Sequence, residues 1–186
     1  MFLRACPLLQ AASLVLALSG AAVAQTPLLN KQPPGFDDFM ERVREYLKLR
    51  NGLPNQRTNK RQDQIIDRRH TLADAIREAR PMAKQGDIFT PESTPEFLKI
   101  IRGILQGASS ANARRTIRQG EPVTGVHLAV NAAYPARLPR TTVPPTLLMR
   151  LPRLPDKLAY RIVGHDLVLQ DTEARLVVDF IPGALP

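Results

Sequence analysis

Six prolines between residues 135 and 155 set the strongest constraint on the fold of this chain. Proline lacks an amide N–H and clashes with the preceding turn, so no long helix or central strand can cross this stretch. A single helical turn at residues 146–151 is the most regular structure expected there. The segment therefore joins two halves of different character, either as an ordered crossover that wraps on helices or as a disordered linker.

The half before the prolines has the periodicity of helices. Apolar side chains between Phe36 and Leu47 recur at helical spacing, and Asn51-Gly52 followed by Pro54 is a stop signal. A second helix is expected over residues 60–85, with a kink at Pro81. Alanines on its inner face would let the first helix approach closely, which favours an antiparallel helical hairpin.

A third helix is predicted to begin at one or both of two similar motifs. Thr90-Pro91-Glu92 and Thr94-Pro95-Glu96 each place a hydroxyl, a proline and an acid where a helix begins. Its apolar face would consist of Phe97, Ile100, Ile101, Ile104 and Leu105. A further short helical segment is expected over residues 112–119.

The half after residue 120 has the pattern of strands. Residues 123–130 predict one strand, and residues 160–163, 167–170 and 175–181 predict a three-stranded antiparallel meander with turns at hairpin spacing. A helix over residues 172–180 is the alternative, which Val177-Val178 disfavours. Arg161, Gln170, Arg175 and Asp179 would mark the more hydrated face of the sheet.

These elements together predict an α+β fold. An N-terminal helical half, built from a hairpin and a third helix, packs on a small C-terminal antiparallel β-meander. Residues 36–186 would form one domain, divided into a helical half (36–119), a proline-rich crossover (120–157) and the meander (158–182). Residues 25–35 read as a flexible leader.

The first 24 residues predict a cleaved secretory signal peptide. Arg4 precedes an apolar stretch that ends in Ala22-Val23-Ala24, so cleavage is expected between Ala24 and Gln25. A membrane anchor is the alternative, but a spanning helix needs about 20 apolar residues and this run is shorter. We therefore expect a bacterial protein that is periplasmic or secreted.

Cleavage would remove the only cysteine, Cys6, and leave a basic chain without disulfides or thiolate ligands. Twenty of the 26 basic residues are arginines, and the mature chain would carry 25 basic and 17 acidic residues, or +8. This charge suggests an anionic partner such as lipid, an envelope polymer or an acidic protein. Compositional bias, with charges scattered over a solvated surface, is the simpler explanation. Nucleic acid is disfavoured by export and by the lack of tryptophan.

One group of acidic and histidine residues has the chemistry of metal ligands. Asp63, Asp67, His70 and Asp74 lie at helical spacing on one face of the predicted second helix, and Asp67, His70 and Asp74 are the candidate metal ligands. Neighbouring arginines would compete for these carboxylates, so an ordinary solvated face is the main alternative. Convergence of His70 with His127 and His165 is a further possibility that the sequence leaves open.

No motif for catalysis or for a cofactor is present. The sequence has no G-x-S-x-G elbow, no S-x-x-K and no glycine-rich phosphate loop. We therefore expect no bound cofactor, and a non-catalytic role is favoured over an enzymatic one. Electrostatic attachment to an anionic envelope surface would use a set of arginines near the helices: Arg68, Arg69, Arg114, Arg115 and Arg118.

The C-terminal segment resembles part of a known family. Leu154-Pro155, Tyr160, Val163-Gly164, Asp166, Val168-Leu169 and residues 176–179 stand in the order found in small periplasmic proteins of nickel/cobalt homeostasis. That family has G-Y-x-W-x-x-V-G-x-D-x-V-L, whereas this chain has Ala159 for the first glycine and Ile162 for the tryptophan. The resemblance covers about thirty residues. It implies a β-hairpin and a periplasmic location, but it does not extend to metal handling.

The expected function is therefore that of an exported, non-catalytic binding or accessory protein of the envelope. A periplasmic metal-handling protein or metal-dependent enzyme is the first alternative, and attachment to an anionic surface is the second.

Overall fold

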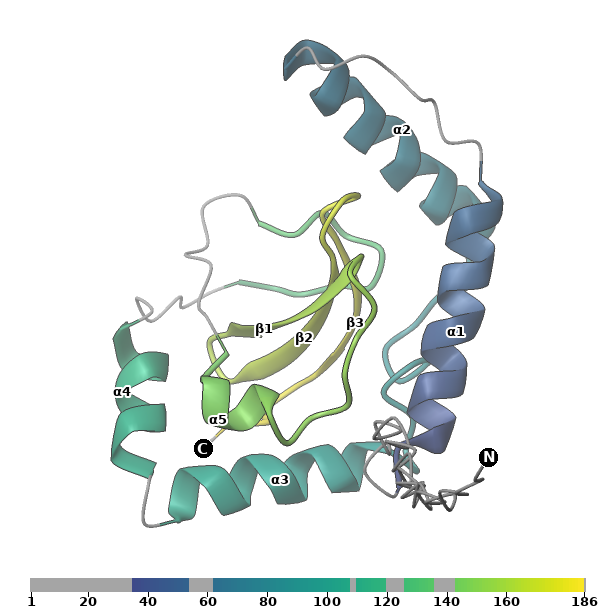
Figure 1. Ribbon diagram of the computed structural model, residues 1–186. Helices are drawn as coiled ribbons and strands as arrows, with labels where there is room; N and C mark the ends of the chain where they lie inside the picture. Colours follow the sequence, from purple (N-terminus) through teal and green to yellow (C-terminus); the bar gives the residue numbers. More distant parts are fainter. Residues whose placement is uncertain (1–34, 54–61, 108–109, 120–125, 136–142, 186) are drawn as a thin grey trace, which may run out of the picture. The chain divides into compact units, whose positions relative to one another are not determined.

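A computed structural model of the chain describes residues 35–53, 62–107, 110–119, 126–135 and 143–185. The side chains of residues 62–66, 68 and 118–119 also lie outside this description. Within these ranges five helices precede three strands (Figure 1). They are α1 (Asp37–Gly52), α2 (Gln62–Ala79), α3 (Thr94–Gln106), α4 (Ser110–Gln119), α5 (Pro145–Leu148), β1 (Leu158–Val163), β2 (Asp166–Asp171) and β3 (Leu176–Ile181). The α+β fold is thereby confirmed, with the helices N-terminal to the sheet.

Helix α1 forms where the periodicity predicts it and buries the expected stripe. Phe39, Val43 and Tyr46 are buried on one face. Phe39 stacks on Phe89 at 5.3 Å between ring centroids and meets the edge of Phe97 at 4.9 Å. Edge-to-face and offset aromatic pairs of this kind add to the free energy gained from burial. These rings join α1 to α3 and to the loop before α3.

Helix α2 ends at Ala79, so the predicted kinked helix reaching residue 85 is wrong. The Arg80 amide still donates to the Ile76 carbonyl at 3.0 Å, but Pro81 has no N–H to continue the ladder. The residue before a proline also disfavours helical backbone angles. Turns follow instead, and Gly86 has a φ of +89°, which glycine adopts at little cost.

Of the two predicted starts for α3, the second is used. The helix begins at Thr94, and the Thr94 hydroxyl donates to the Phe89 carbonyl at 3.0 Å. The Thr90 hydroxyl is engaged elsewhere, because it donates to the Asp38 carboxylate at 2.5 Å. Phe97, Ile101 and Leu105 are buried as expected, with Ile100 and Ile104 partly buried beside them.

The three strands form an antiparallel meander in the order β1-β2-β3, as predicted. Tyr160 on β1 pairs with Leu169 on β2, and Leu169 pairs with Asp179 on β3. A bulge between Leu169 and Gln170 shifts the β2–β3 register. The alternative helix over residues 172–180 does not form, since β3 occupies residues 176–181.

The outer face of the sheet is less hydrated than predicted. Val163, Val168 and Val177 form a second buried cluster with Tyr134, and partly buried Val126 and Leu128 pack against it. Asn131 donates to the Val177 carbonyl at 2.8 Å, so the segment covering this face is tied to β3. Gln170 is buried beneath this cover at 6 % exposure, whereas Asp179, at 0 %, lies on the inner face with its register partner Leu169 and is covered by the loop at Gly86–Phe89, so the assignment of both residues to a hydrated face is wrong.

Two predicted segments differ from the structure or lie partly outside the described residues. The strand expected over 123–130 is not a strand in its described part, 126–130, and only Ala133 forms a β-bridge, with Leu176. The crossover from residue 143 onward is ordered, because Val143, Leu147 and Leu151 belong to the main core. The signal peptide and residues 25–34 of the leader lie outside the described residues.

Membrane-spanning helices need both length and hydrophobicity, and the described helices can be assessed for both. Among them, none combines the length and the hydrophobicity of a membrane-spanning segment.

Candidate functional site

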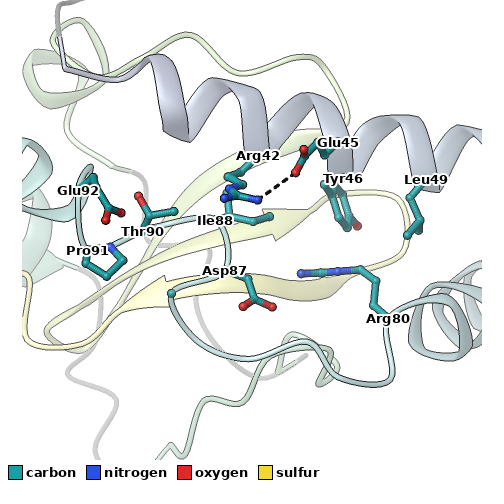
Figure 2. A pocket seen from close by; sticks show the side chains of 11 residues that line it. Arg42, Glu45, Tyr46, Leu49, Arg80, Asp87, Ile88, Thr90, Pro91 and Glu92 are labelled. Atoms are coloured by element: carbon teal, nitrogen blue, oxygen red, sulfur yellow. Dashed lines mark hydrogen bonds and ion pairs between the residues drawn. The ribbon is translucent and has the colours of Figure 1, made fainter.

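A pocket of about 470 Å³ lies between α1 and the loop that connects α2 to α3 (Figure 2). Helix α1 contributes Arg42, Glu45, Tyr46 and Leu49, and the loop contributes Arg80 and residues from 86–92. The volume falls within the range of small-molecule sites, about 300–1,000 Å³. The lining combines an aromatic ring, aliphatic walls and charges of both signs.

Arg80 is the distinctive side chain of this pocket. Its guanidinium carbon lies 5.1 Å from the centroid of the Tyr46 ring, a cation–π contact. A guanidinium has five N–H donors, yet in the described residues it makes one hydrogen bond, a long one of 3.4 Å from Nη1 to Asn131 Oδ1. No ion pair joins Arg80 to a carboxylate within the described part of the chain. Burial lowers the pKa of the guanidinium from its ordinary value, although nearby Asp87 and Asp179 act in the opposite direction.

The acidic side chains of the pocket differ in how they are engaged. Glu45 accepts a hydrogen bond from Arg42 at 3.3 Å, so these two charges offset each other. The Asp87 carboxylate accepts the Lys84 amide N–H at 2.9 Å and forms no ion pair among the described residues, although its charge acts on nearby Arg80. Glu92 forms no ion pair with any cation among the described residues. Arg80, Asp87 and Glu92 are thus the charges in the pocket that a ligand can meet.

One wall of the pocket is fixed by a buried carboxylate on β3. The Asp179 oxygens accept the amide N–H groups of Gly86 at 3.0 Å and of Ile88 and Phe89 at 2.8 Å each. These three hydrogen bonds hold the loop in one conformation and position Asp87 and Ile88 at the pocket. Burial raises the pKa of Asp179 against the lowering effect of those N–H groups. Its position within β3 and its engagement by the loop make Asp179 a structural group.

The opposite wall is held by a second buried carboxylate, at the end of β2. Asp171 accepts hydrogen bonds from the Tyr46 hydroxyl at 2.9 Å and from Arg50 Nε at 2.6 Å. Arg50 Nη2 reaches Glu173 at 2.6 Å. Burial, with the adjacent Asp171 charge, raises the pKa of Tyr46 far above its ordinary value. Tyr46 therefore stays protonated and offers the pocket a rigid ring rather than an acid–base group.

The predicted metal ligands lie away from this pocket. Asp67, His70 and Asp74 are exposed on α2, and Asp74 forms an ion pair with Arg77 at 2.6 Å. Across the described residues, no group of three or more histidine, cysteine or acidic side chains is placed to hold a metal ion. Asp63 lies among the side chains that are not described. The metal site stays a prediction of the sequence.

The other two histidines are engaged differently. His127 is exposed on the segment that precedes Tyr134. His165 is exposed in the β1–β2 turn, where Nδ1 lies 3.1 Å from the Leu185 carbonyl oxygen. His70, His127 and His165 are all described, and they belong to no such metal-binding group.

The arginines proposed for surface attachment differ in exposure and in hydrogen bonding. Arg114 donates from Nε to the Leu105 carbonyl at 2.9 Å and caps the C-terminus of α3. Arg115 is exposed and Arg69 is half-buried. The side chains of Arg68 and Arg118 lie outside the described residues. Attachment to an anionic surface through these arginines stays a prediction. Arg114 also stabilises the end of α3 through its hydrogen bond to Leu105.

The pocket itself was not among the sites expected from the sequence. Arg80 lies inside the helix predicted over residues 60–85, where it is one more charged residue, and the one local signal is the proline that follows it. Its contacts, Tyr46 and Asn131, are 34 and 51 positions distant in the sequence, so only folding brings them together. The role of the pocket must be inferred from these residues, because no protein-family model, no curated protein and no solved structure matches this chain.

Proposed function

We propose that this chain is an exported, non-catalytic binding protein whose ligand occupies the pocket beside Arg80. The observation that carries the proposal is the Arg80 guanidinium, which is partly withdrawn from water and has most of its donors unused at the edge of a preformed cavity. A polar group in that position costs free energy unless it gains a partner. A bound ligand would supply that partner.

The other polar groups of the pocket support binding rather than catalysis. Its two hydroxyls are both committed to carboxylates outside the cavity, Tyr46 to Asp171 and Thr90 to Asp38. Both residues are buried, at 4 % and 6 % exposure, so neither hydroxyl is presented to a ligand as a nucleophile. Both walls are anchored to the sheet, so the pocket is largely formed before a ligand arrives.

The proposal is tested by titrating the full chain, produced with its N-terminal segment in a bacterial host, with four small probes. Acetate, ethylammonium, isobutanol and the dipeptide Gly-Leu represent an anion, a cation, an apolar molecule and a zwitterion. We expect at least one to shift the NMR signals of Arg80, Tyr46 and Ile88 saturably, while exposed Arg102 on α3 stays unchanged. Four titrations without a saturable shift at the pocket would refute ligand binding there.

The same preparation tests export. N-terminal sequencing of the periplasmic fraction should begin at Gln25, since Ala22-Val23-Ala24 has the small-x-small pattern. Ala24→Arg is the matched variant and should leave the longer precursor. An intact N-terminus in the cytoplasmic fraction of the unaltered chain would contradict export.

A further inference from the structure

We propose that the ligand of the Arg80 pocket is a zwitterion of the amino-acid or short-peptide class, with its carboxylate on Arg80 and its ammonium on Asp87 and Glu92. This inference rests on the proposed function, since it names the chemistry of the molecule that would occupy the same pocket. It follows from three features of the lining: the form of the cation, the position of the acids and the apolar side chains beside them.

The cation is presented in the form that suits a carboxylate. The Arg80 guanidinium carbon lies over the Tyr46 ring, and most of the N–H edges of this planar group make no hydrogen bond among the described residues. Those edges form the fork that binds two carboxylate oxygens at once. Because Tyr46 is itself held by Asp171, the ring provides a fixed support that orients the fork before binding.

The acids lie along the pocket, Asp87 near the Arg80 fork and Glu92 at the far end. Figure 2 shows Arg80 at one end of the pocket and Glu92 at the other, with Asp87 between them. Neither acid has an ion-pair partner among the described residues, and Arg42 and Glu45 offset each other at 3.3 Å. A simple anion would satisfy Arg80 but face two carboxylates, whereas a simple cation would meet Arg80. A molecule with both charges satisfies both ends.

Apolar side chains form part of the lining beside the charged groups. Leu49 comes from α1, and Ile88 and Pro91 come from the loop. Ile88 is held in place by the hydrogen bond that its backbone N–H donates to Asp179. An aliphatic side chain on the ligand would be covered by this surface, so a leucine-containing zwitterion is a suitable probe.

The test compares three dipeptides by isothermal titration at low salt with the full chain. These are Gly-Leu, N-acetyl-Gly-Leu, which lacks the ammonium, and Gly-Leu amide, which lacks the carboxylate. We expect each blocked form to bind at least about tenfold more weakly than Gly-Leu, since each loses the hydrogen bonds made by one charged group. Free leucine, measured alongside, distinguishes an amino acid from a short peptide as the source of the two charges.

Variants assign each end of the ligand. Arg80→Met should abolish the difference between Gly-Leu and its amide, and Arg80→Lys should retain part of it, because the charge remains but the fork is lost. Asp87→Asn with Glu92→Gln should abolish the difference between Gly-Leu and its acetylated form. Arg102→Met and Glu78→Gln, exposed on α3 and α2, are the matched controls and should change neither difference. Melting temperatures report whether each variant is folded.

The outcomes separate this inference from the function on which it rests. If acetylated Gly-Leu binds as tightly as Gly-Leu, the ligand is an anion, and if the amide does, it is a cation. Either result overturns the zwitterion but leaves the pocket as a binding site. If no dipeptide binds while acetate, ethylammonium or isobutanol still shifts the pocket signals, the ligand class is again overturned. Failure of every probe overturns the proposed function as well.

Discussion

Asp179 is a fully buried carboxylate that accepts three amide N–H groups from the pocket loop. Burial raises its pKa above the ordinary 3.8, so the folded chain keeps the proton at a pH where the unfolded chain has released it. In that range the free energy of unfolding falls as the pH rises, by about 1.4 kcal/mol for each pKa unit of difference. The stabilising contribution is therefore present below pH 3.8 and is lost as the pH passes the folded pKa.

Asp179→Asn tests this sign, because asparagine does not titrate. The free energy of unfolding is measured in urea between pH 3 and pH 7. The unaltered chain should be more stable than the variant by a larger margin at pH 4 than at pH 7. Asp156→Asn, at an exposed position, is the matched control for loss of one charge. If the stability advantage of the unaltered chain instead grows with pH, the amide N–H groups lower the pKa of Asp179 by more than burial raises it.

Single residues also show where prediction from the sequence reaches its limit. Phe39, Val43 and Phe97 are predictable core residues, because helical spacing of apolar side chains is a local signal. Arg50, Asp171 and Asp179 are polar residues whose burial depends on partners about 90 to 125 positions away, and no local pattern encodes those partners. Arg80 belongs to the same class, which is why the pocket escaped a sequence-based search.

At the level of elements, α1 is fastened to the end of β2 by a buried ion pair. The Arg50 and Asp171 side chains are 2 % and 0 % exposed and lie 2.6 Å apart. Hydrogen bonds from Arg50 to Asp171 and Glu173 raise its pKa despite the opposing effect of burial. Removing the arginine would leave the Asp171 charge in the core without its cation, and breaking such a pair costs about 3–5 kcal/mol.

We therefore expect Arg50→Met to lower the free energy of unfolding by about 3–5 kcal/mol in urea denaturation. Lys48→Met, on the exposed side of α1, removes the same charge from the same helix and should change stability by less than about 0.5 kcal/mol. Equal losses in the two variants would show that the ion pair contributes no more than a surface charge.

The elements themselves were predicted unevenly, for physical reasons. The meander was predictable because β-branched residues alternate with turn signals at hairpin spacing. The end of α2 was misplaced, since Pro81 permits either a kink or a stop, and here the turns up to Gly86 are held by Asp179. The segment from residue 126 to 130 has strand-like composition but covers one face of the sheet without joining it as a strand.

Across the larger unit of residues 32–186, the buried interactions link early residues to late ones. Tyr46 and Arg50 reach Asp171 across more than 120 positions, and the loop at Gly86 reaches Asp179 across 93. One hydrophobic cluster includes residues from Phe36 to Leu185. Neither half can satisfy its buried polar groups alone, and a chain whose only cysteine is Cys6 has no intrachain disulfide to assist it.

We therefore expect residues 25–186 to unfold in one cooperative transition. Calorimetry should give equal calorimetric and van't Hoff enthalpies, the signature of two-state unfolding. A chain shortened to residues 25–157 lacks the sheet, so Tyr46, Arg50 and the loop N–H groups lose their carboxylate partners, and it should show no cooperative transition. If that shortened chain melts cooperatively with the helical signal of the full chain, the helices form an independent unit and the long-range carboxylates only dock the sheet onto them. The pocket would then survive without β2 and β3, and Gly-Leu titration of the shortened chain would reveal it.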